Sequence, residues 1–265
     1  MTAAQGRGDR SPRAAIARHP IAAYLAIAFG ASWAMTALLS MSLMFGLLAL
    51  FGPALAALVV SWADGTSGEL RRRITGWRTA PSLIPVALAI PFAVGAAAAV
   101  VWILAGHAAP GLGSISAIEV VIFVLVIGEE IGWRGFLMPR LRSRMSLPAA
   151  SLATGVVWTL WHLPIYLAPG QGLAAFAVFA AWVVPFALVM GVVVERAYFS
   201  VLVATVMHGA ANVSLPILLP GVDHTWTMLA TGTLYLLLAI VLIARTRTES
   251  PQFSVVPQHT KEVAA

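Results

Sequence analysis

The chain has 265 residues, of which 60% are hydrophobic and 10% are charged, and its mean hydropathy is +0.90. A soluble domain usually carries about 25% charged residues, so this composition excludes an ordinary soluble protein and indicates a polytopic membrane protein. The absence of cysteine excludes disulfides, thiol catalysis and cysteine–metal sites. The net charge of +6 comes from loops and tails, so we interpret it as a signal of membrane topology and expect no nucleic-acid partner.

Apolar runs of about 20 residues, the length that a membrane-spanning helix requires, recur along the chain. The runs are continuous and do not alternate over about 10 residues, as the strands of a membrane barrel do. We therefore predict an all-α fold, a polytopic membrane helical bundle with about eight transmembrane helices in the lipid bilayer. In chain order the predicted spans are residues 20–39, 42–63, 82–105, 118–138, 149–168, 173–194, 200–219 and 226–244. They form a predicted transmembrane domain over residues 20–244, between a disordered N-terminal tail (1–19) and a C-terminal tail (245–265).

The basic residues indicate how these spans cross the membrane. With eight spans, every lysine and arginine outside the spans falls on one side, and the opposite loops contain neither. These residues are Arg7, Arg10, Arg13, Arg18, Arg71, Arg72, Arg73, Arg78, Arg140, Arg142, Arg144, Arg196, Arg245, Arg247 and Lys261. By the positive-inside rule both termini are cytoplasmic. The Ala- and Arg-rich composition favours a bacterial source, so we expect an integral protein of the bacterial plasma membrane.

Two adjacent acids, Glu129 and Glu130, lie with Arg134 in the fourth predicted span. A charged residue at membrane depth costs roughly 2.5–3.5 kcal/mol on insertion scales, so these acids indicate a functional site that faces the protein interior. Glu130 and Arg134 are four residues apart, so they share a helix face and can form an ion pair. Glu129 is rotated from that face by about 100° and is not tied to the arginine in the same way.

Two further predicted spans carry polar residues at the same spacing. Trp158 precedes His162 by four residues in the fifth span, and Asn212 follows His208 by four in the seventh. At about 1.5 Å of rise per residue, the two histidines, Asn212 and Glu130 lie roughly 12–20 Å from the cytoplasmic ends of their helices. The three helices thus offer polar side chains in one layer near mid-membrane, where these groups can meet if the helices are neighbours.

Structural explanations remain open for most of these residues. A buried histidine such as His162 commonly hydrogen-bonds a neighbouring helix, and Glu130 and Arg134 can simply neutralise each other. Asn212 can join two helices, an interaction worth about 0.6 kcal/mol on average in membranes. Glu129 is the residue that a structural role explains least well.

These residue types support hydrolysis of an acyl or peptide bond inside the membrane. A carboxylate within reach of a histidine can deprotonate water, and a second histidine with an amide can donate hydrogen bonds to a developing oxyanion. Alternatively, the Glu, His, His and Asn side chains can ligate a divalent metal whose bound water attacks. The sequence contains neither H-E-x-x-H nor G-x-S-x-G, and its aspartates lie outside the predicted spans, which argues against other intramembrane protease chemistries.

Three segments together resemble the motifs of a known family. The run G-E-E-I-G-W-R-G-F-L at residues 128–137 resembles the E-E-x-x-x-R motif of the CPBP family, which comprises type II CAAX endopeptidases related to the Ras-converting enzyme, with bacterial Abi and bacteriocin-immunity relatives. Residues 158–162 match its F-x-x-x-H motif, with Trp158 in place of the usual Phe. Residues 208–212 match H-x-x-x-N. The motifs stand in the family's order and cover residues 118–215.

The resemblance implies a helical intramembrane protease. Glu129 would activate water together with His162, while His208 and Asn212 would stabilise the oxyanion. The substrate would be a membrane-associated peptide or protein, although nothing in the sequence indicates a pocket for a prenyl group.

The resemblance also implies supporting residues and a candidate cofactor. Glu130 would be held by Arg134, and Trp158 would fill an aromatic packing position. Because the family is described as metal-dependent, a divalent metal such as Zn is a candidate cofactor. Its tentative ligands are Glu129, His162 and His208.

Two other functions remain open. An ion- or proton-coupled transporter could use the Glu and His residues as a relay, but the chain lacks the internal repeats that many secondary transporters carry. A non-catalytic immunity or scaffold membrane protein could retain the same residues. The leading hypothesis is an intramembrane endopeptidase.

Overall fold

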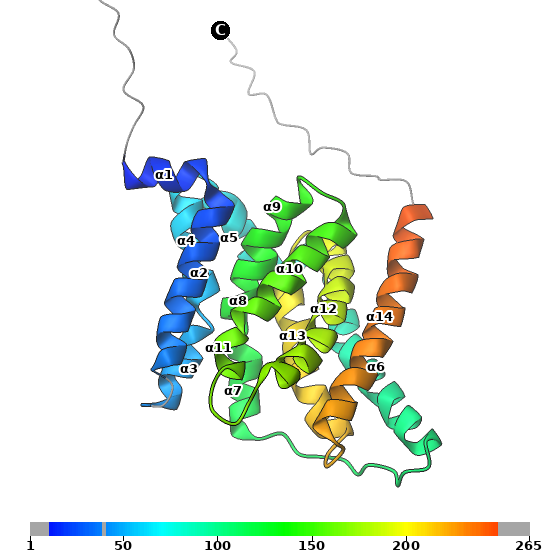
Figure 1. Cartoon of the computed structure of the whole chain (residues 1–265). Helices are drawn as coiled ribbons and strands as arrows, with labels where there is room; N and C mark the ends of the chain where they lie inside the picture. The colour runs from blue at the N-terminus through cyan, green and yellow to red at the C-terminus, as the bar shows by residue number, and fades with distance from the viewer. Residues whose placement is uncertain (1–10, 39–40, 249–265) are drawn as a thin grey trace, which may run out of the picture.

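The computed structural model describes residues 11–38 and 41–248, and the described chain contains helices and no strand, which confirms the predicted all-α class. In chain order (Figure 1) the elements are α1 (Pro12–Arg18), α2 (Pro20–Ala37), α3 (Leu43–Ala49), α4 (Gly52–Ala63), α5 (Ser67–Thr75), the 3-10 turn η1 (Trp77–Thr79), α6 (Leu83–Leu104), α7 (Ala117–Leu125), α8 (Ile127–Gly132), the π-helical turn η2 (Trp133–Leu137), α9 (Met138–Arg142), α10 (Leu147–Trp161), α11 (Leu163–Tyr166), α12 (Leu173–Arg196), α13 (Val201–Leu218) and α14 (His224–Thr248).

Within the described residues, six segments are long and apolar enough to cross a membrane, as judged by length and composition. These segments are Pro20–Ala37, Leu43–Ala63, Leu83–Leu104, Leu173–Arg196, Val201–Leu218 and His224–Arg245. They correspond to the first three and the last three predicted spans. The chain is therefore an integral membrane protein, and the count of eight spans stays a prediction.

The fourth predicted span, residues 118–138, consists of several short helices in place of one long helix. α7, α8, η2 and α9 follow one another and are stacked along the height of the bundle (Figure 1). α7 begins with a capping box, in which Ser116 and Glu119 bond each other's backbone N–H groups. Glycines occur at positions 128, 132 and 135 of these short helices. Because glycine destabilises the interior of a helix, they favour the division of this span.

The fifth predicted span, residues 149–168, is also divided. α10 has 15 residues and ends at Trp161, and the short helix α11 begins at Leu163. Pro164 explains this break, because proline has no N–H to donate to the carbonyl four residues earlier. His162 lies at the junction of the two helices.

The N-terminal tail differs from the prediction of disorder over residues 1–19. Residues 12–18 form α1, because Ser11 Oγ accepts a hydrogen bond from the Ala14 N–H at 3.2 Å and Pro12 starts the helix. At the other end, α14 runs to Thr248, beyond the predicted boundary at 244. The rest of both predicted tails, residues 1–10 and 249–265, lies outside the described part of the chain.

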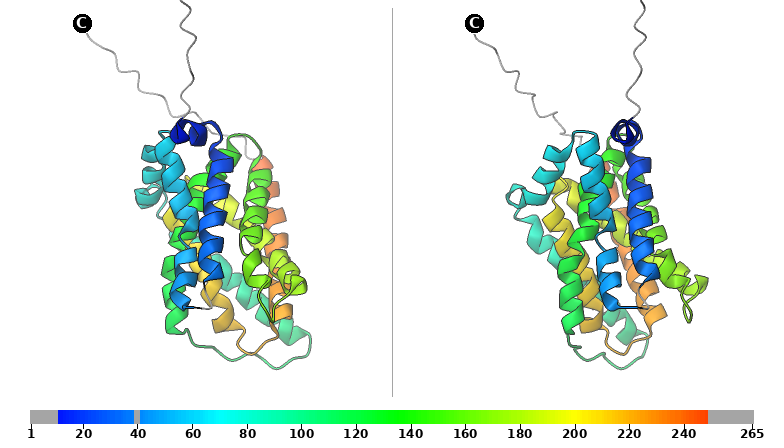
Figure 2. Two further views of the ribbon diagram at one scale, coloured as in Figure 1. Left: turned by 60° about the vertical axis from the view of Figure 1, so that its left-hand side comes forward. Right: turned by 90° about the vertical axis from the view of Figure 1, so that its left-hand side faces the viewer.

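The helices form a bundle whose centre is built by α12 and α13. In these two helices 61% of the apolar span is buried, against 17% in α2 and 28% in α6 and α14. α12 packs against α10 and α14, and α13 packs against α6 and α7. α2, α3 and α4 lie on one side of these central helices, with α6 and α14 on the opposite side (Figures 1 and 2). The polar residues of α8 and α13 therefore face the interior of the bundle.

Close approach of α7 to α13 depends on Gly209, the residue that follows His208. A Cβ atom at this position would lie 2.6 Å from the Phe123 ring of α7, well inside van der Waals contact. Small residues allow such close packing of membrane helices. Gly209 thereby fixes the distance between α7 and the helix that carries His208.

We predict that Gly209→Ala destabilises the protein by about 1–3 kcal/mol, the usual cost of overpacking a core. Gly30→Ala is the matched control, because a Cβ there would meet no atom within 4 Å. Replacing a mid-helix glycine by alanine in open space stabilises a helix by roughly 0.5–1 kcal/mol. Unfolding of both purified variants in detergent measures the difference, and equal stability of the two would contradict this explanation of Gly209.

Candidate active site

The predicted acid pair lies in the middle of the bundle, where α8 passes into η2 (Figure 1). Glu129 is 2% exposed, Glu130 0% and Arg134 1%, so all three are shielded from lipid and water. Arg134 Nη1 donates to Glu130 Oε1 at 2.9 Å, which is the i,i+4 ion pair that the spacing predicts. The turn that presents Arg134 is π-helical, and such turns are frequent at functional sites.

A histidine from α13 reaches the same carboxylate. His208 Nδ1 lies 2.8 Å from Glu130 Oε1, although the two residues are 78 positions apart in the chain. Since that oxygen also accepts from Arg134, His208 Nδ1 must be the donor, and its Nε2 is left for other partners. Glu130 therefore joins α8, η2 and α13 in one interaction.

Trp158 of α10 connects the second motif, residues 158–162, to this cluster. Its indole Nε1 donates to Glu129 Oε2 at 2.7 Å. Its ring lies under the Arg134 guanidinium at 4.3 Å and meets the His208 ring edge-on at 4.9 Å. The predicted role of Trp158 was aromatic packing alone, but the structure adds a hydrogen bond that the phenylalanine usual in the family motif could not donate.

His162, at the end of α10, is half-buried and bonds its own helix. Its Nδ1 lies 2.9 Å from the Trp158 carbonyl oxygen, which can only accept. Nδ1 therefore carries the proton in the neutral ring, and Nε2 keeps a free lone pair. The His162 ring also meets Trp161 and Phe179 edge-on, at 4.7 and 4.8 Å. No hydrogen bond joins His162 to Glu129 among the described residues.

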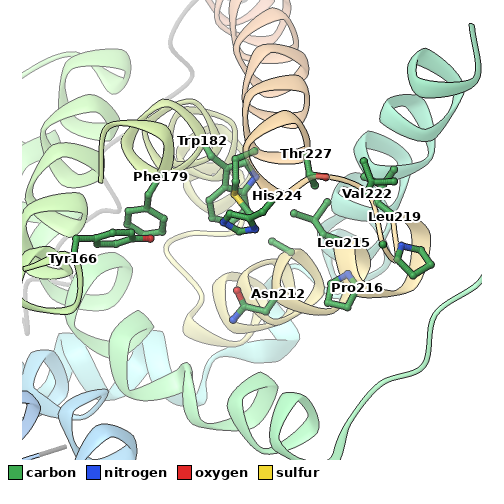
Figure 3. A pocket seen from close by; sticks show the side chains of 14 residues that line it. Tyr166, Phe179, Trp182, Asn212, Leu215, Pro216, Leu219, Val222, His224 and Thr227 are labelled. Atoms are coloured by element: carbon green, nitrogen blue, oxygen red, sulfur yellow. The ribbon is translucent and has the colours of Figure 1, made fainter. Parts of the chain in front are cut away.

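Asn212 lies one turn after His208 on α13 and lines a cavity of about 580 Å³. Figure 3 shows Asn212 at this cavity together with side chains of α11, α12 and α14, among them Phe179 and His224. Most of the lining is apolar, so the amide is one of few polar groups there. His162 lines a separate cavity of about 80 Å³.

The structure thus gathers most, but not all, of the predicted site residues. Five of them form one buried, connected group, which we call the acid cluster. The acid cluster consists of Glu129, Glu130, Arg134, Trp158 and His208. The other two lie outside the acid cluster. The His162 ring lies against the ring of Trp158, at 5.9 Å between centroids, and Asn212 lines the cavity of about 580 Å³.

The tentative metal ligands do not form a metal site in this arrangement. Among residues 11–38 and 41–248, no group of three or more His, Cys, Asp or Glu side chains is placed to hold a metal ion. Glu129 Oε2 is bonded to an indole N–H, and His162 Nδ1 to a backbone carbonyl. The donor set of Glu129, His162 and His208 therefore does not fit a shared metal ion.

The sequence did not reveal Tyr24, which belongs to the surroundings of this cluster. Tyr24 of α2 is fully buried, stacks on Phe136 at 4.7 Å and meets Trp133 edge-on at 5.8 Å. Its hydroxyl lacks a hydrogen-bond partner among the described residues, as do Glu130 Oε2 and Arg134 Nη2. Buried polar atoms of this kind are commonly satisfied by internal water. A tyrosine within an apolar span carries no sequence signal that would have singled it out.

Comparison with known proteins agrees with the motifs. Residues 111–214 match the family described as type II CAAX prenyl endopeptidase Rce1-like, and all three motifs lie inside that segment. The chain is similar to CAAX prenyl protease 2 of Methanococcus maripaludis, with 27% identity over 134 residues, which cover 46% of this chain and 49% of the relative. The matched part thus spans about half the length of that protein. The resemblance inferred from the sequence is confirmed over the segment that carries the motifs: residues 111–214 are similar to the Rce1-like family of type II CAAX prenyl endopeptidases.

Proposed function

We propose that this chain is an intramembrane endopeptidase that hydrolyses a peptide bond of a membrane-associated protein or peptide. The observation that carries the proposal is the unequal environment of the two adjacent acids. Glu130 is paired with Arg134 and His208, whereas Glu129 forms no ion pair within the described part of the chain and accepts there from the neutral N–H of Trp158. Paired acids whose environments differ in this way divide into a basic and a supporting role. Glu129 is the general base in this assignment.

Glu129 and His162 activate water in this proposal. Both lie against Trp158, one bonded to its indole N–H and the other to its backbone carbonyl. A general base acts directly or through one water molecule, and catalytic hydrogen bonds often tighten only when substrate is bound. The free Nε2 of His162 is positioned by its Nδ1 hydrogen bond to share the proton of that water.

His208 and Asn212 stabilise the oxyanion of the tetrahedral intermediate. The Glu130 carboxylate accepts from His208 Nδ1 and so orients the ring, and in this scheme the ring also carries a proton on Nε2, which donates to the oxyanion. Asn212 follows on the same helix face and offers a second donor. Glu130 and Arg134 are supporting residues in this scheme.

The cavity of about 580 Å³ beside Asn212 would hold an apolar part of the substrate. Its walls include Phe179, Trp182 and Leu215, and apolar pockets with a few convergent polar groups are typical ligand sites. The name of the Methanococcus relative makes a prenylated peptide the first substrate to test.

Membrane topology follows the sequence prediction in this proposal, with eight spans, both termini cytoplasmic and a bacterial plasma membrane as the location. Support comes from contacts at one end of the bundle. Arg140 pairs with Asp64 at 2.8 Å, and Arg142 pairs with Glu195 at 2.5 Å, so the ends of α4, α9 and α12 lie together. Arg13 of α1 donates to the last residue of α4 at 3.4 Å. These basic segments lie at one end of the bundle (Figure 1).

We predict that Glu129→Gln lowers the rate of peptide cleavage by about 10²–10⁴-fold, the usual contribution of a general base. The purified proteins are assayed in detergent with a prenylated and an unmodified membrane peptide, and terminal proteomics of cells carrying either form identifies natural products. Glu119→Gln is the control, because Glu119 is only partly buried, lies outside the acid cluster, and glutamine preserves its capping hydrogen bond.

Two outcomes would contradict the proposal. Full cleavage by Glu129→Gln would remove Glu129 from the base role. Proton flux in liposomes that depends on Glu129, without cleavage of any peptide by the native protein, would support a transporter.

A second prediction concerns the indole hydrogen bond. Trp158→Phe keeps an aromatic ring but leaves the buried Glu129 oxygen unpaired, which typically costs about 1–3 kcal/mol. Trp161→Phe is the matched control one turn away, because its Nε1 has no partner among the described residues. Detergent unfolding should show lower stability for Trp158→Phe, together with slower cleavage. If both variants are equally stable, the Glu129–Trp158 bond has no energetic role.

A further inference from the structure

A third cavity, of about 480 Å³, lies away from the acid cluster at the basic end of the bundle. α5, η1 and the connection between α12 and α13 enclose it, and we call it the basic cavity. Two of its lining residues are the arginines Arg72 and Arg73, and one is an acid, Glu69. Neither the family motifs nor the proposed catalysis uses any residue of this cavity.

A buried hydroxyl without a partner lines the basic cavity. Ser200 is 2% exposed, and its Oγ has no hydrogen-bond partner among the described residues. Ser200 occupies the N-cap position of α13, yet its side chain makes no capping hydrogen bond. The first N–H groups of this 18-residue helix therefore lack the side-chain acceptor that a serine normally supplies. The Ser200 hydroxyl thus lines the cavity at the N-terminal end of α13.

The two arginines add positive charge that the protein neutralises only in part. Arg73 donates to the Gly135 carbonyl at 3.0 Å and pairs with Glu69 at 3.3 Å. The Arg72 guanidinium, which is exposed, has no hydrogen bond or ion pair within residues 11–38 and 41–248. Burial is the main cause that lowers the pKa of Arg73, and Glu69 partly offsets it. One carboxylate thus faces two guanidinium groups.

The backbone at the cavity is unusual. Tyr198 and Phe199 have φ angles of 54° and 59°, and they are the non-glycine residues with positive φ in the described chain. Bulky residues rarely adopt this conformation, which costs energy that the surrounding structure must balance. Together with Ala197, the two residues connect α12 to Ser200, so the strained turn sets the position of the start of α13.

We propose that the basic cavity binds an oxyanion of the phosphate class. A helix N-terminus with free N–H groups favours an anion, and arginine provides the strongest hydrogen bonds to phosphate oxygens. The unpartnered Ser200 hydroxyl supplies a further donor. The same chemistry fits free inorganic phosphate and the phosphate of a membrane lipid headgroup. This site is independent of the catalytic proposal, because none of its ligands belongs to the acid cluster.

The test uses the full chain purified in detergent, with two probes. Inorganic phosphate is titrated by calorimetry, and retention of phosphatidylglycerol against phosphatidylcholine is compared by native mass spectrometry. Arg72→Gln is expected to weaken binding about 10-fold or more, and Ser200→Ala several-fold, since a hydrogen bond to a charged group is worth about 1.5–3 kcal/mol, that is, roughly 10-fold or more. Arg71→Gln is the matched control, because Arg71 is also exposed on α5 but does not line the cavity.

Glu69→Gln gives a test of opposite sign. Removing this carboxylate should tighten anion binding, whereas a cation site would be weakened. Saturable binding of phosphate supports a free anion, and selective retention of phosphatidylglycerol supports a lipid headgroup. The proposal is overturned if the native chain binds neither probe, or if Arg72→Gln and Ser200→Ala bind as Arg71→Gln does. Cleavage activity decides neither outcome, so the two proposals can fail separately.

Discussion

The carboxylate of Glu130, shared between Arg134 and His208, is the interaction on which the interior of this protein depends. Burying a charge in a membrane protein is costly unless it is paired and hydrogen-bonded. Glu130 is fully buried, and one of its oxygens accepts from both partners at 2.8–2.9 Å. Separating α13 from α8 would keep the Glu130–Arg134 pair but would leave the His208 N–H without its acceptor in an apolar interior. The His208–Glu130 contact therefore holds the two helices together.

Because Glu130 is occupied in this way, we assign the role of general base to the adjacent acid, Glu129. Glu129 points to a different side of α8, where Trp158 is its hydrogen-bond donor. An indole N–H orients a carboxylate without neutralising it, unlike an arginine or a histidine. Trp158 also contacts Arg134 and His208 through its ring, so one side chain sets the geometry of both acids. In the proposed mechanism the two neighbouring glutamates differ in role because Glu129 faces Trp158 of α10, whereas Glu130 faces His208 of α13.

Sequence reasoning succeeded where the interaction is local. The spacing of Glu130 and Arg134 fixes a contact within one helix, and length and hydropathy identify six of the spans. It could not give the pairing of Glu130 with His208, because 78 residues separate them and only the packing of α13 on α8 brings them together. Hydropathy also predicts continuous spans through η2 and His162. The interruptions there come from a π-helical turn and from Pro164, which a hydropathy window does not register.

The π-helical turn η2 contacts both the acid cluster and the basic cavity. Arg134 enters the acid cluster from this turn, while the Gly135 carbonyl, one residue on, accepts from Arg73 of the basic cavity. A Cβ on Gly135 would lie 3.0 Å from Val201 of α13, so the turn is also packed against the helix whose end forms that cavity. Gly135 is held by Arg73 on one side and packs against Val201 on the other, so it has little freedom to move alone. An anion in the basic cavity could shift Arg73 and, through Gly135, the acid cluster. Because coupling between binding sites is reciprocal, a ligand at the acid cluster would then change the affinity of the basic cavity by the same factor.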